Sequence, residues 1–190
     1  MLETRIRPDL AVLCTRFGLG DEARALVRPE HDERTFVTAL LAAEQFADAV
    51  RFIAATLPVR ESIWWAWSCA RRTLPPEPPP AVLAALDATE RWIAQPTELN
   101  RRPTLAVSEA ADMGTPAGAA AFAVFFSGGS IAPPQAPPVA PPANAAARAV
   151  AGSVILACVS DPPELAPERF RQFVSQAMDV AVRIQLWPPA

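Results

Sequence analysis

The sequence predicts an all-α protein, a single-domain bundle of about seven or eight helices with proline-rich connecting straps. Three observations lead to this prediction. Apolar residues recur with the 3.6-residue period of a helix along most of the chain. Prolines and glycines mark the ends of these periodic segments. No alternating run of apolar and polar residues between turns indicates a sheet. Residues 1–190 are therefore expected to form one helical domain, with proline-rich connections at 75–80 and 132–142 inside it.

The first half of the chain contains three clear helical segments. A helix is expected over about 33–42, followed by an amphipathic helix over about 44–57. The apolar face of the second helix consists of Phe46, Val50, Ile53 and Leu57. Pro58 ends that helix, and it can also open the next one as a first-turn proline. That third helix is expected to run to about residue 73.

Further helices follow the proline-rich break. One is expected over 81–95, and another begins near 96–98, where Pro103 either kinks it or marks its true start. The segment 116–126 is almost entirely apolar, so it should be buried on most sides. A helix of small residues is expected over 143–159, and a final helix begins near Pro167.

Residues 133–142 are rich in proline and should form a polyproline II segment. Ten such residues span about 30 Å, the length of a helix of about 20 residues. We interpret the segment as a crossover strap along the outside of the bundle, which lets the next helix run in the same direction. The alternative is a ligand for an SH3-like partner.

The turn before this segment is a candidate site formed by Ser127, Gly128, Gly129 and Ser130. Its two glycines could expose backbone N–H groups to an anion. The interpretation that we favour is a flexible turn that leads into the proline-rich segment.

Composition excludes several functional classes. The net charge is −3 and the basic residues do not cluster, so no nucleic-acid partner is expected. All 17 basic residues are arginines, which codon bias in a GC-rich genome explains. No apolar run reaches the roughly 18–20 residues of a membrane span, and the N-terminus lacks a signal-peptide pattern. Three cysteines without a CxxC spacing indicate reduced thiols and a cytoplasmic protein.

The most informative segment is 60–72, which holds three of the five tryptophans. At about 100° per residue, Trp65 lies about 100° to one side of Trp64, and Trp67 lies about 60° to the other. The three indoles cannot share one core stripe, so this helix needs neighbours on more than one flank. It is either an internal helix wrapped by neighbours or a recognition face for a protein partner. The candidate partner-binding residues are Arg60, Trp64, Trp65, Arg71 and Arg72.

No coherent set of catalytic residues appears, and no metal or cofactor is expected. Residues 18–23 match G-x-G-x-x-A, but the repeated strand–helix units of a dinucleotide fold are missing. Gly18 is better explained as the end of a short helix. His31 is the only histidine and, without a CxxC, leaves no ordinary zinc site.

Four segments in this order resemble a family of uncharacterised bacterial proteins classed as a domain of unknown function. They are residues 54–66, Pro96-Thr97-Glu98-Leu99-Asn100-Arg101-Arg102, Ser127-Gly128-Gly129-Ser130-Ile131-Ala132-Pro133 and Arg148-Ala149-Val150-Ala151-Gly152. The resemblance covers nearly the whole chain and implies no established activity. It does imply a neighbourhood of bacterial secretion genes, including type VI effector clusters, and through it an accessory role.

Our leading hypothesis is therefore a non-enzymatic binding module, an adaptor or chaperone-like accessory protein that binds a protein partner. One alternative is a self-associating structural subunit whose tryptophan surface closes a homo-oligomer. The other is a small hydrolase or transferase that uses Cys69 or Glu61 beside Glu98 and Arg101, which requires these groups to converge in one pocket.

Overall fold

The computed structural model describes residues 9–187, and all the regular secondary structure in this range is helical, as expected. It comprises eleven α-helices and one short 3-10 helix, η1. Seven α-helices have ten or more residues and correspond to the periodic segments of the sequence. The other four have eight residues or fewer, and they explain why the structure has more helices than the seven or eight expected from the sequence. The elements are Leu10–Phe17 (α1), Asp21–Ala25 (α2), Glu33–Ala42 (α3), Phe46–Thr56 (α4), Val59–Arg72 (α5), Pro80–Ala94 (α6), Glu98–Arg101 (α7), Thr104–Ala110 (α8), Pro116–Phe125 (α9), Ala145–Cys158 (α10), Pro163–Leu165 (η1) and Ala166–Arg183 (α11).

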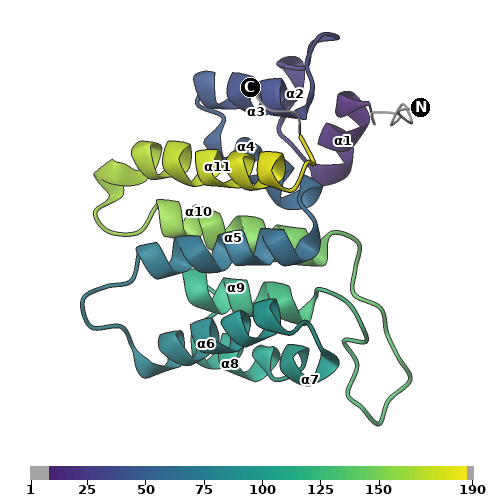
Figure 1. Cartoon of the computed structure of the whole chain (residues 1–190), viewed down its shortest axis with the longest axis vertical. Coiled ribbons are helices and arrows are strands. Elements are labelled where there is room, and N and C mark those ends of the chain that lie inside the picture. The colour runs from purple at the N-terminus through teal and green to yellow at the C-terminus, as the bar shows by residue number, and fades with distance from the viewer. Residues whose placement is uncertain (1–8, 188–190) are drawn as a thin grey trace.

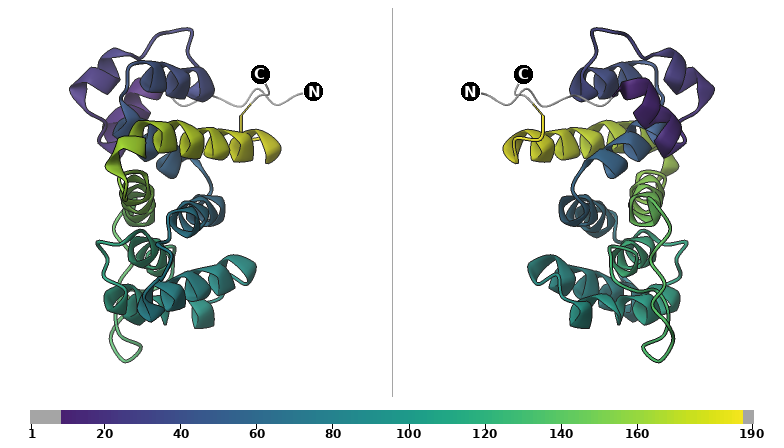
Figure 2. Two further views of the ribbon diagram at one scale, coloured as in Figure 1. Left: turned by 90° about the vertical axis from the view of Figure 1, so that its left-hand side faces the viewer. Right: turned by 90° about the vertical axis from the view of Figure 1, so that its right-hand side faces the viewer.

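The helices are stacked in layers along the longest axis of the molecule (Figure 1). Helices α1 to α3 lie at one end, and α4 and α11 form the next layer. Helices α5 and α10 pack side by side in the middle, and Figure 2 shows both nearly end-on. Helix α9 lies next to this pair, and α6, α7 and α8 lie at the other end, where α6 contacts both α9 and α5. The middle layers therefore receive neighbours from both directions.

Helix α5 has such neighbours on several flanks, as the distribution of its tryptophans predicts. It packs against α6, α9, α10 and α11. The indole N–H of Trp65 donates to the backbone oxygen of Phe173 in α11 at 2.8 Å. On another flank, the indole N–H of Trp67 donates to the backbone oxygen of Leu86 in α6 at 3.2 Å. Each of these two rings thus packs apolar surface against the protein and also satisfies its indole N–H.

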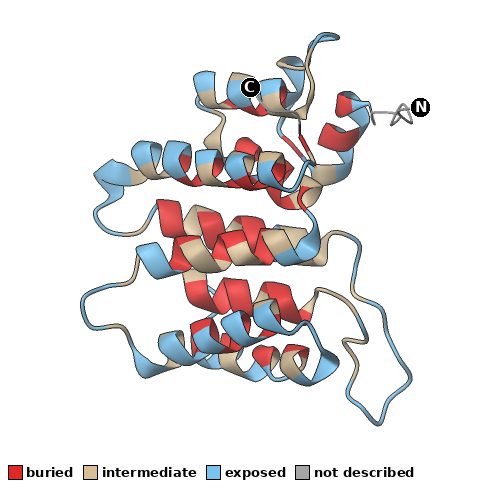
Figure 3. Cartoon of the chain, in the orientation of Figure 1, coloured by how far each residue is buried: buried red, intermediate tan, exposed pale blue. Residues whose placement is uncertain are grey.

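Two hydrophobic clusters run through the stack, and they share α5, α6 and α9. Figure 3 shows the buried residues concentrated on the facing sides of the middle layers. Helix α9 is buried at most of its positions, as its apolar sequence predicts. Its alanines let neighbouring helices approach closely, although each supplies little buried area. Among the described residues no single helix is long and apolar enough to cross a membrane. Helix α10 and residues 163–183 reach the required length and apolar composition only when taken together, and the chain bends by 119° between them.

The connection between α9 and α10 differs from the predicted crossover strap. The hydroxyl of Ser153 in α10 donates to the backbone oxygen of Pro116 in α9 at 2.7 Å. This contact places the start of α9 beside the second half of α10, as in an antiparallel pair. The loop leaves α9 and enters α10 on the same side of the stack, the right-hand side of Figure 1. The prediction was wrong because the backbone N–H of Ile131 donates to the oxygen of Val139 at 2.8 Å. This bond closes the prolines into an outward loop.

We predict that Trp65→Phe destabilises the protein more than Trp67→Phe. Trp65 is completely buried, so the change removes its hydrogen bond to Phe173 and leaves unfilled volume in the core. The expected loss is about 2 kcal/mol of unfolding free energy for Trp65→Phe and about 1 kcal/mol for the half-buried Trp67. Urea denaturation followed by circular dichroism measures both. Equal losses would contradict the central position of Trp65.

Candidate functional site

The tryptophan helix does not present all five predicted partner-binding residues on one surface. Trp65 has no exposed surface, so it cannot contact a partner and must be removed from the predicted face. Arg71 faces α6 instead, where its guanidinium lies 3.6 Å from Glu90 and over the ring of Trp67. Angles around a single helix could not show which flanks other helices cover.

Trp64 is half-buried and lies between two hollows on the surface shared by α5 and α11. The smaller hollow, of about 240 Å³, also involves the end of α6. The larger, of about 530 Å³, runs along α11. Both are lined by Trp64, Val180 and Arg183, so they form one continuous surface that we call the Trp64 groove. The remaining lining residues are Arg60, Glu61, Arg72, Ile93, Arg171, Gln172, Ser175, Gln176 and Asp179.

Four arginines line this groove, against two acidic residues, Glu61 and Asp179. Two of the four are already held. Arg60 donates to the backbone oxygen of Ile93 at 2.7 Å, and Arg171 lies 3.4 Å from the carboxylate of Glu44.

The other two arginines of the groove have no carboxylate partner among residues 9–187. Arg72 lies over the ring of Phe173, and Arg183 makes no polar contact there. Of the predicted face, Arg60, Trp64 and Arg72 therefore meet in the groove. Arg171 and Arg183 were not predicted, because the sequence does not show that α11 packs beside the tryptophan helix.

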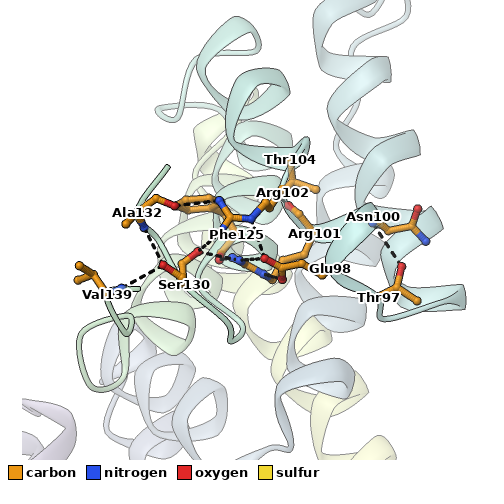
Figure 4. Close-up of polar contacts among 10 residues, drawn as sticks. All are labelled: Thr97, Glu98, Asn100, Arg101, Arg102, Thr104, Phe125, Ser130, Ala132 and Val139. Atoms are coloured by element: carbon orange, nitrogen blue, oxygen red, sulfur yellow. Dashed lines mark hydrogen bonds and ion pairs between the residues drawn. The ribbon is translucent and has the colours of Figure 1, made fainter. Parts of the chain in front are cut away.

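The second candidate, residues 127–130, is anchored to α7 through two arginines (Figure 4). The side chain of Arg101 is 4% exposed and donates to both carboxylate oxygens of Glu98 at 2.7 Å. It also donates to the backbone oxygen of Phe125, and to that of Ser130 at 2.8 Å. This buried guanidinium is therefore satisfied by a carboxylate and two carbonyl oxygens.

Arg102 extends the same network. It donates to Glu98 at 2.7 Å, to the backbone oxygen of Ala132 at 2.9 Å and to that of Ser130 at 3.1 Å. The hydroxyl oxygen of Ser130 accepts from the backbone N–H groups of Ala132 and Val139 at 3.1 and 3.0 Å. These hydrogen bonds fix the end of the turn, and its carbonyl oxygens point toward the guanidinium groups of Arg101 and Arg102. That polarity is the reverse of an anion-binding nest.

The network also sets the charge of Glu98. Hydrogen bonds from Arg101, together with the charges of both arginines, hold the pKa of Glu98 below its usual value of 4.5. The ionised carboxylate is thus the form that the folded protein favours.

The groups required for a hydrolase or transferase are not brought together by these contacts. Cys69 lies in the main hydrophobic cluster, and burial raises its pKa well above 9.0. Burial also raises the pKa of Cys14 to about 11 and that of Cys158 to about 12. A thiol with a raised pKa is a poor nucleophile at neutral pH. Within residues 9–187 no three His, Cys, Asp or Glu side chains gather where they could hold a metal ion.

Comparison with known proteins adds one finding. The model of a family described as a family of unknown function (DUF6931) matches residues 36–181. This range contains the network around Arg101 and every lining residue of the Trp64 groove except Arg183. The match confirms the expected resemblance to a family without an established activity. No curated protein and no solved structure matches the chain.

We predict that Gly129→Ala destabilises the protein, whereas Gly128→Ala does not. Gly129 has a φ of +63°, and a Cβ there would lie 2.9 Å from both Arg101 Nη2 and Glu98 Oε2. The expected loss is about 1–2 kcal/mol of unfolding free energy. A Cβ on Gly128 would meet nothing within 4 Å, so this neighbour is a matched control with an expected change under about 0.5 kcal/mol. Similar urea denaturation midpoints for both variants would exclude the tight anchor.

We also predict a pH-dependent contribution of Glu98 to stability. Because its pKa is lower in the folded state, ionised Glu98 stabilises the protein above 4.5, and this contribution is lost as the pH falls through the folded-state pKa. The difference in unfolding free energy between wild type and Glu98→Gln should therefore be largest near neutral pH and shrink under acid conditions. Urea denaturation of both proteins across this range provides the test. A difference that is independent of pH would contradict the assignment.

Proposed function

The chain belongs to this family of unknown function, DUF6931, and we propose that it is a non-enzymatic helical binding module, an adaptor or chaperone-like accessory protein. The observation that supports the proposal most directly is the Trp64 groove. The indole of Trp64 is half-exposed between two hollows, and arginines line both of them. Tryptophan and arginine are the residues that most often dominate the energy of protein interfaces.

The floor of the groove favours an apolar side chain from the partner. Trp64, Ile93 and Val180 line the smaller hollow and offer apolar surface. Burial of an indole against a partner excludes water from both surfaces and is worth several kcal/mol where the fit is close. The hollow of about 240 Å³ has room for one or two side chains of a partner segment rather than for a whole domain.

The charges favour an acidic segment. Arg72 and Arg183 both line the larger hollow, and neither has a carboxylate partner among the described residues. Arg72 is the last residue of α5, and Arg183 is the last residue of α11. Guanidinium groups form planar, two-point hydrogen bonds with carboxylates. We therefore take the partner to be a protein segment that combines carboxylates with at least one large apolar side chain.

The setting of this function remains part of the proposal. A cytoplasmic location is supported by the three free, buried cysteines, which suit a reducing compartment. A link to a bacterial secretion system rests on the resemblance in sequence described above.

We predict that Trp64→Ala and Arg183→Gln both reduce recovery of the partner in pull-downs from cells of the source organism, quantified by mass spectrometry. Trp64→Ala should cost about 2 kcal/mol or more of binding free energy, since it empties the floor of the groove. Arg183→Gln should cost about 1 kcal/mol and make binding less sensitive to salt. Arg91→Gln is the matched control, because it removes the same charge from an exposed arginine of α6 that does not line the groove.

Circular dichroism must show that every variant is folded. Equal recovery by wild type and all three variants would remove the groove as the binding surface. A wild-type dimer that Trp64→Ala dissociates, measured by light scattering, would instead assign the groove to a second copy of the chain.

A further inference from the structure

A separate hollow of about 520 Å³ lies between the turn that joins α1 to α2, helix α4 and one face of α10. We call it the α10 pocket. Its size is in the range of pockets that hold small organic molecules. It shares no lining residue with the Trp64 groove. It collects two sequence features that the proposed function does not use, the Gly18-Leu19-Gly20 turn and the segment from Arg148 to Gly152.

Gly152 gives the pocket its depth. It lies in the interior of α10, where glycine is the least favourable residue apart from proline. Close packing does not require it, since a Cβ there would meet nothing within 4 Å. The missing side chain therefore leaves open space on the side of α10 that lines the pocket.

Arg148 supplies an unused positive charge at the same place. It stands four residues before Gly152, so it lies one turn away on the same face of α10. It is exposed and has no ion pair or hydrogen-bonded side-chain partner among residues 9–187.

The remaining charges of the pocket leave this arginine in excess. Arg51 reaches the pocket from α4 and is held by Asp48 at 2.9 Å, so this pair contributes little net charge. The first turn of α10 carries no acidic residue, so the positive end of the helix dipole adds to the charge of Arg148.

The rest of the lining is largely apolar. Phe17 contributes an aromatic ring from the end of α1, and Ile155 contributes an aliphatic side chain from α10. A pocket with a positive charge beside apolar walls favours a ligand that carries one anionic group on an apolar body.

We propose that the α10 pocket binds a small organic anion, a molecule that joins one carboxylate or phosphate group to an apolar body of about the size of a benzene ring. Arg148 contacts the anionic group, with Arg51 beside it. The apolar body lies over Gly152, between Phe17 and Ile155. This assignment is independent of the Trp64 groove and stands if that groove proves to have no partner.

Phenyl phosphate and benzoate are suitable probes, with inorganic phosphate and benzyl alcohol as controls for the charge alone and the ring alone. Binding is measured by isothermal titration calorimetry at millimolar ligand. We expect at least one of the two probes to bind wild type more tightly than both controls. Arg148→Gln should weaken that binding about tenfold through loss of a charged contact. Gly152→Leu should abolish it by filling the pocket. Arg91→Gln removes an exposed arginine that lines neither the α10 pocket nor the Trp64 groove, so it should leave the binding unchanged.

Gly152→Leu also carries its own check on folding. Leucine is a better helix former than glycine and has open space here, so this variant should unfold at the same or a higher urea concentration than wild type. Loss of binding in a variant of undiminished stability supports the pocket. The proposal is overturned if neither probe binds wild type, or if binding survives both Arg148→Gln and Gly152→Leu.

Discussion

The structure depends on the burial of α5 from several sides at once. Its tryptophans point in directions that no single neighbour can cover, so the helix has to lie inside the stack. The hydrogen bond from the Trp65 indole to the backbone of Phe173 joins α5 to α11, and the bond from Trp67 to Leu86 joins it to α6. These two contacts link segments that are far apart in the sequence. The half-exposed Trp64 marks the one flank that other helices leave open, and this is why the groove forms there.

The family resemblance rests partly on residues that hold the fold together. Two of the four ordered motifs meet in the network of Glu98, Arg101 and the turn at 127–130, where every strong donor is satisfied within the protein. A buried guanidinium without such partners would be costly, so these residues are constrained as a group. The resemblance therefore identifies an anchor between α7 and a loop, and it does not by itself locate chemistry.

Much of the helical architecture could be predicted because its signals are local. Helix α3 begins and ends at the predicted residues, and its start coincides with a capping box formed by Asp32 and Thr35. Helix α9 begins at Pro116, with Thr115 as its cap. The path of the loop before α10 could not be predicted in this way. Its direction depends on one backbone bond between Ile131 and Val139, which polyproline propensity does not reveal.

The candidate sites show the same limit. The sequence named Arg60, Trp64 and Arg72 as candidates, but the arginines from α11 reach the groove only because of how that helix crosses α5. Trp65 was assigned to a partner surface because angles on one helix do not tell how many neighbours cover it. Arg148 and Gly152 carry no recognisable motif for binding, and only the hollow beside them gives them a common role.

The outward loop has a practical consequence. Its base is fixed by Arg101, Arg102 and the bond between Ile131 and Val139, whereas residues 133–138 lie beyond these ties and are exposed. Chain inserted at an exposed tip between fixed ends leaves the underlying packing undisturbed. A fluorescent reporter or affinity label could therefore be inserted within residues 133–138 without blocking the Trp64 groove or the α10 pocket.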